Sequence, residues 1–104
     1  MNTKTKSSAL RYIEELRGGP LTFGRMIQSV RKADGIAQAE LALKMAISRA
    51  HLCDIENGRR SVSVDRAAKF AKVLGYSVTQ FVAQAVEDQL LKNGIKVKVY
   101  LEAA

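Results

Sequence analysis

The chain has 104 residues, which is enough for one domain with a modest core and too few for two. Lysine and arginine outnumber aspartate and glutamate by 17 to 10. This surplus of positive charge favours nucleic acid over a membrane surface as the partner. The alternative is that the basic residues only keep the chain soluble. One cysteine excludes an intrachain disulfide and a cysteine-based metal cluster, and no run of about 18 apolar residues is present to span a bilayer.

Residues 1–21 are predicted to form an arm and a short helix ahead of the main domain. The first seven residues hold two lysines among small polar residues, with too little apolar surface to fold. From Ser8 to Arg17, leucine and isoleucine recur at spacings of three, and Gly18-Gly19-Pro20 ends the helix. This stretch lacks the apolar core of a signal peptide, so we expect a cytoplasmic protein. The chain also lacks a glycine-rich phosphate loop and a two-histidine metal spacing, so we expect no cofactor and no metal.

Residues 22–92 are predicted to form one all-α domain. Helix starts are indicated by side chains that can accept hydrogen bonds from the first free amides, and helix ends by residues that tolerate a left-handed backbone. In chain order the starts are at Thr22, Ser48, Ser63 and Ser77, and the ends are at Gly35, Asn57-Gly58, Gly75 and Asn93-Gly94. The helices that follow Ser63 and Ser77 are expected to cover Val64–Leu74 and to reach about Lys92.

The segment 36–60 reads as two short helices joined by a tight turn. The side chains expected to point inward are Leu41, Ala42 and Met45 in the first helix and Leu52 and Ile55 in the second. The outward face of the second helix then consists of Arg49, Ala50, Cys53 and Asp54, in two pairs one turn apart. This face is available to a partner.

Arg31 lies beside the inward stripe of the helix that begins after Thr22. A buried guanidinium needs a carboxylate, and Glu56, at the end of the second short helix, is the obvious candidate. The alternative is that Arg31 stays solvated and pairs with nothing.

The end of the chain, residues 93–104, changes its hydrophobic period from helix to strand. Apolar side chains alternate with polar ones at Ile95, Val97, Val99 and Leu101. No other segment reads as a strand, so we expect this one to pair with the same strand of a second copy or with a partner protein. The alternative is a frayed tail that orders only in a crystal.

Residues from Thr22 to about Phe81 resemble the phage-repressor-like (Xre/Cro-type) helix-turn-helix family. Each matching motif is weak by itself, but all of them occur in order and at the family's spacing. They are Phe23-Gly24-x-x-Ile27 with Arg31, Gln38 with Glu40-Leu41-Ala42, Ile55-Glu56-Asn57-Gly58, and Val73-Leu74-Gly75 with Ser77.

The resemblance implies a five-helix domain that binds duplex DNA as a two-fold dimer, with the helix after Ser48 in the major groove. Arg49 would face guanine, Ala50 would offer a methyl to thymine, and Asp54 would accept from cytosine or orient Arg49. Phosphate contacts would come from Gln38, Ser48, His51, Asn57, Arg59 and Arg60. Arg31 and Glu56 would form an internal ion pair.

Two positions depart from the family pattern. Ala37 stands where a capping serine or asparagine is usual, which forgoes roughly 1 kcal/mol of capping. Ala46 replaces the usual turn glycine, and the substitution costs energy if that site needs a positive φ.

Two functions of different classes remain open. An enzyme is not expected, because His51 and Cys53 point about 200 degrees apart on one helix and cannot act as a nucleophile–base pair. One hypothesis is a repressor of a palindromic operator. The other is an interaction protein, the antitoxin of a toxin–antitoxin pair, which would mask a toxin and repress its own operon. An adjacent overlapping gene for a small, toxic, co-purifying protein would favour the second.

Overall fold

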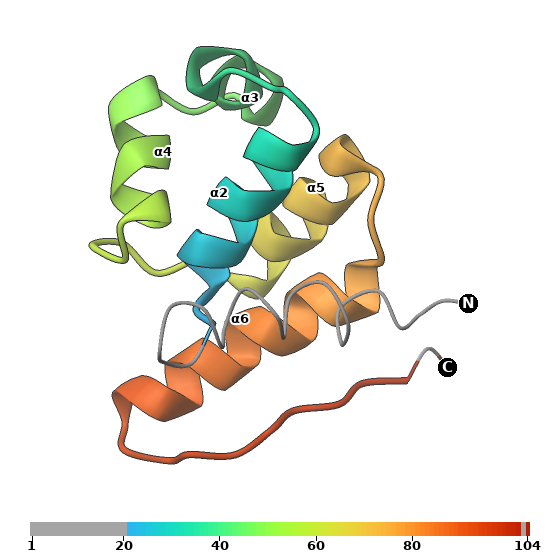
Figure 1. Ribbon diagram of the computed structural model, residues 1–104. Coiled ribbons are helices and arrows are strands. Elements are labelled where there is room, and N and C mark those ends of the chain that lie inside the picture. Colours follow the sequence, from blue (N-terminus) through green and yellow to red (C-terminus); the bar gives the residue numbers. More distant parts are fainter. Residues whose placement is uncertain (1–20, 103) are drawn as a thin grey trace.

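The computed structural model describes residues 21–102 and 104, and these form five helices, labelled α2 to α6 in Figure 1. Their bounds are α2 Phe23–Ala33, α3 Gln38–Met45, α4 Arg49–Glu56, α5 Val64–Leu74 and α6 Val78–Lys92. The prediction of five helices in an all-α domain is confirmed, and none of these helices is both long and apolar enough to cross a membrane. The predicted arm and helix before residue 21 lie outside the described residues.

Four of the five helices begin at the predicted caps. The side-chain oxygens of Thr22, Ser48, Ser63 and Ser77 each accept a hydrogen bond from the backbone N–H three residues later. The exception is α3, which follows Ala37 and has no side-chain cap. At the other end of α5, Gly75 takes a left-handed φ of 80°, as the sequence indicated.

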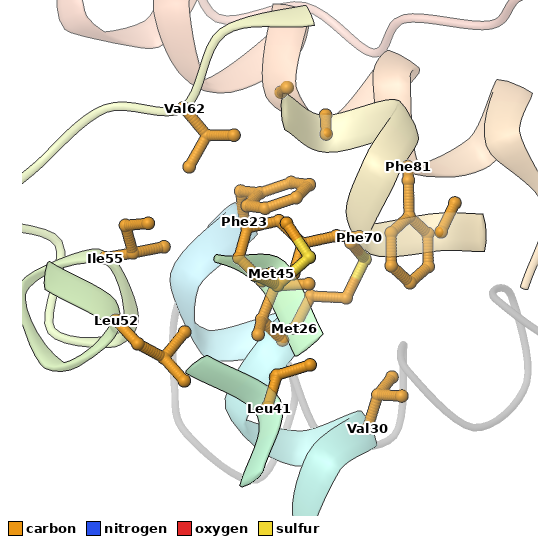
Figure 2. Packing of buried hydrophobic residues seen from close by; sticks show 14 of the residues in the cluster. Phe23, Met26, Val30, Leu41, Met45, Leu52, Ile55, Val62, Phe70 and Phe81 are labelled. Atoms are coloured by element: carbon orange, nitrogen blue, oxygen red, sulfur yellow. The ribbon is translucent and has the colours of Figure 1, made fainter. Parts of the chain in front are cut away.

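The core contains buried apolar side chains from all five helices (Figure 2). At its centre, Phe23 of α2 lies between Phe70 of α5 and Phe81 of α6, with ring centroids 5.8 and 6.0 Å apart. Leu52 and Ile55, at most 1% exposed, bring the inner side of α4 onto this core. Aromatic and aliphatic burial of this kind therefore holds α4 against the rest of the domain.

The N-terminus of α2 is held by α6. Asp88 accepts a hydrogen bond from the backbone N–H of Phe23 at 2.7 Å, and the Gln84 amide donates to the Leu21 carbonyl at 2.8 Å. Gln84 also donates to Asp88 at 3.1 Å, so the two side chains form one network. Burial raises the pKa of Asp88 above its usual 3.8, and the bonds from Phe23 and Gln84 partly oppose that rise.

Helices α2 and α4 approach each other at Gly24. A Cβ atom added there would lie 2.1 Å from the carbonyl oxygen of Ile55 and 3.0 Å from that of Glu56. Both are backbone atoms, so a side chain could fit only if the helices moved apart. The glycine thus permits the close contact that sets the position of the C-terminal end of α4.

The β-strand predicted for the end of the chain is not formed within residues 21–102. The segment that contains Ile95, Val97, Val99 and Leu101 is extended and runs back beside α6 (Figure 1), where the Val99 N–H donates to Glu87 at 3.0 Å. A strand needs the backbone of a second strand, and the described chain offers none. Ile95, Val97 and Leu101 stay 43–48% exposed, so the described chain does not cover these apolar side chains.

Candidate nucleic-acid interface

Helix α4 starts at a cap that the sequence specifies. The Ser48 hydroxyl accepts from the backbone N–H of His51 at 3.0 Å, and the Ser48 carbonyl accepts from the N–H of Leu52 at 3.1 Å. One free amide of the first turn is thereby satisfied, and the orientation of the helix start is fixed. The Ser48 side chain is therefore already engaged in the cap.

The turn between α3 and α4 does require a positive φ. Ala46 has φ 59° and ψ 40°, and it is the one non-glycine residue with positive φ in the described chain. This conformation costs an alanine roughly 1 kcal/mol. The N–H of Ile47 donates to the Ala42 carbonyl at 3.0 Å, and the Lys69 ammonium donates to the Met45 carbonyl at 3.0 Å. Helix α5 thus holds the turn through Lys69, a contact that the sequence did not indicate.

The outward side of α4 is close to the predicted one. Arg49 and Ala50 are exposed, whereas Cys53 and Asp54 are half-buried. His51 is also half-buried, on the side of α4 that approaches α5. The face open to a partner is therefore widest at the N-terminal turn of the helix.

A chain of hydrogen bonds links the buried core to this face. Arg31 donates to the Glu56 carboxylate through Nε at 2.7 Å and Nη2 at 3.1 Å, and its Nη1 donates to the Ile36 carbonyl at 2.9 Å. The side chains of Arg31 and Glu56 are 10% and 0% exposed, so the two residues form a buried ion pair. Glu56 Oε1 also accepts from Gln38 Nε2 at 3.1 Å, and Gln38 Oε1 accepts from Arg49 Nε at 3.1 Å.

This network restricts what Gln38 can do. Its amide oxygen is used by Arg49 and one amide hydrogen by Glu56, which leaves the second hydrogen as its free donor. The Gln38 orientation is set by the carboxylate, because only the NH₂ group can donate to Glu56. Arg49 is consequently held at Nε. Its terminal nitrogens form no hydrogen bond or ion pair with the described residues.

Within the described residues Asp54 forms no hydrogen bond with Arg49. Asp54 accepts instead from Arg59 Nε at 3.0 Å, and the Arg59 Nη2 lies 3.8 Å from the sulfur of Cys53. The hydrogen bond that Arg59 donates to Asp54, followed by the charge of Asp54, raises the pKa of Arg59 above its ordinary value. Because both side chains are substantially exposed, this ion pair contributes little to the stability of the domain.

The loop after α4 is exposed from Asn57 to Arg60. The Asn57 amide donates to the Cys53 carbonyl at 2.8 Å, and Gly58 adopts a φ of 76° that turns the chain away from the helix. On the far side of the loop, Lys92 of α6 contacts the Ser61 hydroxyl. The loop that carries Arg59 and Arg60 is therefore fixed at both ends.

Arg66 was missed by the sequence reasoning. It lies on the first turn of α5, and its Nη1 is 3.3 Å from Nε2 of His51. Burial, followed by the charges of Arg60 and Arg66, lowers the pKa of His51 below its ordinary 6.5, and the charge of Asp54 opposes this. No motif pairs residues 51 and 66, since their contact depends on how α4 packs near α5.

Positive charge dominates this end of the molecule. Arg49, Arg59, Arg60 and Arg66 lie on or beside α4, and of these four only Arg59 forms an ion pair with a described residue, Asp54. Within residues 21–102 and 104, no group of three histidine, cysteine, aspartate or glutamate side chains is arranged to hold a metal ion. The surface is thus suited to an anion with spaced charges, such as a phosphate backbone.

Comparison with known proteins gives a consistent result. Residues 27–81 match the model of the helix-turn-helix family. Over 73 residues the chain is 35% identical to an immunity repressor protein of Bacillus phage phi105, which covers 70% of this chain and 49% of the repressor. A control protein, C.BamHI of Bacillus amyloliquefaciens, is 36% identical over 56 residues, 53% of this chain and 69% of that protein.

A solved structure agrees with these sequence relatives. The clp gene regulator ClgR from Corynebacterium glutamicum superposes with a TM-score of 0.56 at 29% identity, over 72% of this chain and 83% of that one. The present chain spans about half the length of the phage repressor that it matches. The family match covers more than half of the chain and includes α3, the turn and α4. The chain therefore belongs to the phage-repressor-like (Xre/Cro-type) helix-turn-helix family.

Proposed function

We propose that this protein is a sequence-specific, duplex-DNA-binding regulator of transcription, and that it acts as a repressor. In this proposal α4 lies in the major groove, with its N-terminal turn toward the base edges. Arg49 and Ala50 are the exposed residues of that turn. Arg49 would donate to guanine O6 and N7, and Ala50 would contact a thymine methyl.

The observation that carries this proposal is the connection of Arg49 to the core. An exposed arginine normally has considerable rotamer freedom, and ordering it on binding costs about 0.5–1.5 kcal/mol. Here Gln38 holds the Arg49 Nε at 3.1 Å, and the Arg31–Glu56 pair holds Gln38. The terminal nitrogens, which are the ones that match guanine, remain available. The site is thus partly ordered before it meets DNA.

Asp54 and Arg59 have a different role in the proposal. Asp54 is half-buried on the outward side of α4 and already accepts from Arg59. To accept from a cytosine amino group, Asp54 must use its second oxygen or release Arg59 to a phosphate. We propose that Asp54 keeps its hydrogen bond with Arg59 and so orients the Arg59 side chain along the loop, where Arg59 contacts a phosphate. Asp54 would then contribute to base selection only at the bases next to that phosphate.

The remaining phosphate contacts would surround α4. Gln38 and Ser48 lie at the starts of α3 and α4, where amides favour an anion. His51, Asn57 and Arg60 would contact the backbone on the other side of the groove. Such contacts set the position of the protein on the duplex and the strength of binding without reading the sequence.

We further propose that the protein binds as a homodimer joined through residues 93–104. The exposed side chains of Ile95, Val97 and Leu101 supply an apolar side on an extended segment whose backbone has no ladder partner within residues 21–102. Pairing two such segments would satisfy their backbone groups and cover their apolar sides. The α4 helices of the two copies would then contact half-sites about 34 Å apart.

The same segment supports a second candidate function. An antitoxin would use the exposed side chains of Ile95, Val97, Tyr100 and Leu101 to bind a toxin and would use α4 to repress its own operon. Tyr100 is 84% exposed, which suits an aromatic anchor for another protein. Copurification of a toxic protein encoded by an overlapping gene, lost on deletion of residues 95–104, would favour this candidate over a plain repressor.

Selection from a random pool of duplexes tests the proposed function. The full chain is incubated with the pool, the bound fragments are amplified, and the cycle is repeated at rising salt concentration to remove non-specific binders. We expect one enriched, palindromic sequence with half-sites about one helical turn apart. Recovery of an unenriched pool would contradict sequence-specific binding, and an enriched site without symmetry would contradict the homodimer.

A further inference from the structure

Two basic side chains, His51 and Arg66, meet beside α4, and a third, Arg60, follows that helix in the next loop. His51 comes from α4, Arg60 from the loop that follows, and Arg66 from the first turn of α5. The Arg66 Nη1 lies 3.3 Å from His51 Nε2, and the charge of Arg60 acts on the same ring. Neither Arg60 nor Arg66 forms an ion pair with a carboxylate of the described residues.

The contact with Arg66 defines the protonation state of His51. A guanidinium carries five N–H donors and no acceptor, so a hydrogen bond between the two groups requires Nε2 of the imidazole to accept. The ring is therefore neutral, with its proton on Nδ1. The one carboxylate that acts on the ring is that of Asp54, and Asp54 is held by Arg59 at 3.0 Å.

We infer that His51, Arg60 and Arg66 form a proton-linked phosphate site, in which DNA binding converts His51 from a neutral ring into a cation. The inference rests on the proposed function, because the anion is a backbone phosphate of the duplex bound by α4. It adds Arg66 to the interface and makes the affinity for DNA depend on pH between the His51 pKa values of the free and the bound protein.

The exchange of partners follows from the donors present. When a phosphate enters, an Arg66 N–H that pointed at the imidazole points instead at a phosphate oxygen. Nε2 of His51 then takes up one proton from water and donates it in a hydrogen bond to the same phosphate. One proton is bound per site and two per dimer, and no covalent bond is made or broken.

The direction of the pH effect can be worked out. In the free protein, burial and the two arginine charges lower the pKa of His51. A bound phosphate would raise that pKa, because an anion favours the protonated ring. The complex therefore binds more protons than the free protein, and affinity rises as pH falls between the two pKa values, by at most about tenfold per pH unit for one site and about a hundredfold for a dimer with two sites. Outside this interval the dependence levels off.

His51 is the only histidine of the chain, so its ring signals in an NMR spectrum are unambiguous. The experiment follows the ring carbon-bound protons of the full chain from pH 5 to pH 9, first free and then with a duplex of roughly 20 base pairs. The duplex is the selected one, or a random sequence at low salt if selection yields none. We expect the pKa of His51 to rise by at least one unit on binding.

Two variants and a control complete the test. His51→Gln should bind with an affinity that no longer changes between pH 6 and 8. Arg66→Gln should raise the pKa of His51 in the free protein, weaken binding and reduce the salt slope by about one. Lys72→Gln, on an exposed position of the same helix, should leave the pKa of His51 and the pH dependence unchanged.

Two results would overturn the inference: a His51 pKa that stays constant or falls when the duplex binds, or a pH dependence that survives in His51→Gln. Either can occur while α4 still reads a sequence, so the proposed function would stand. If the selection enriches no sequence but the pKa of His51 still rises on a random duplex, the phosphate site is supported and the reading of bases by α4 is refuted.

Discussion

Replacing Glu56 with glutamine should destabilise the domain more than any exposed charge substitution. The Glu56 side chain is fully buried and accepts three hydrogen bonds, two from Arg31 and one from Gln38. Glutamine has nearly the same shape but places an NH₂ group against one of these donors. The substitution leaves the guanidinium of Arg31, 10% exposed, with the Ile36 carbonyl and one amide oxygen as partners.

The size of the effect follows from burial. Removing one partner of a buried ion pair costs about 3–5 kcal/mol, because the other charge remains in a medium of low polarity. Small domains have a total free energy of unfolding of about 5–15 kcal/mol. We therefore expect Glu56→Gln to lose a large fraction of the stability, and to lower the Tm by at least roughly 12 °C at about 4 °C per kcal/mol.

Urea unfolding followed by circular dichroism measures this difference, provided that the slope m is the same for both proteins. The matched control is Glu40→Gln, which breaks an exposed pair with Lys44 at 3.6 Å, where both side chains are 51% exposed. The control should change the free energy of unfolding by no more than about 0.5 kcal/mol. If Glu56→Gln costs less than about 1 kcal/mol, or no more than the control, the stabilising role of the buried pair is refuted.

Three further expectations concern the backbone and the end of the chain. Ala46→Gly should stabilise the domain by roughly 1 kcal/mol in thermal unfolding, because φ 59° strains alanine, and no gain would contradict that strain. Gly24→Ala should cost about 1–3 kcal/mol or more, because its Cβ would meet the Ile55 carbonyl oxygen, and unchanged stability would show that α2 and α4 separate freely. Deletion of residues 95–104 should yield monomers by light scattering, and a persistent dimer would place the interface elsewhere.

The helices could be predicted because their boundaries are local. Ser48 and Ser63 accept from amides three residues away, and Gly75 needs only its own backbone to end α5. The contact of Arg31 with Glu56 could also be predicted. Arg31 lies beside the inward hydrophobic stripe of its helix, a buried guanidinium needs a carboxylate, and Glu56 at the end of the second short helix was the candidate. Such features can be predicted either from residues within a few helical turns or from the requirement that a buried charge be paired.

Contacts that depend on tertiary packing could not be predicted. Asp88 accepts from the N–H of Phe23 across 65 positions in the chain, and Arg66, on the first turn of α5, reaches His51 across 15 positions. No pattern marks such pairs. The hydrogen bond of Asp54 with Arg59 was missed for the same reason, and so was that of Arg49 with Gln38.

The C-terminal segment shows a different limit. Alternation of apolar and polar residues is a property of one segment, whereas a strand is defined by hydrogen bonds between two. Residues 95–102 satisfy the first condition but not the second within the described chain, where Glu87 accepts the N–H of Val99. Whether the segment becomes a strand therefore depends on backbone outside the described residues.

The central claim is that the N-terminal turn of α4 reads base edges while the adjacent loop contacts phosphate. The most direct test repeats the duplex selection with Arg49→Ala and Arg59→Ala beside the unaltered chain. We expect Arg49→Ala to lose its preference at one base pair of each half-site, and Arg59→Ala to keep every preference while binding all duplexes more weakly with a lower salt slope. If both variants weaken all sequences equally and leave the selected site unchanged, α4 does not read DNA through Arg49.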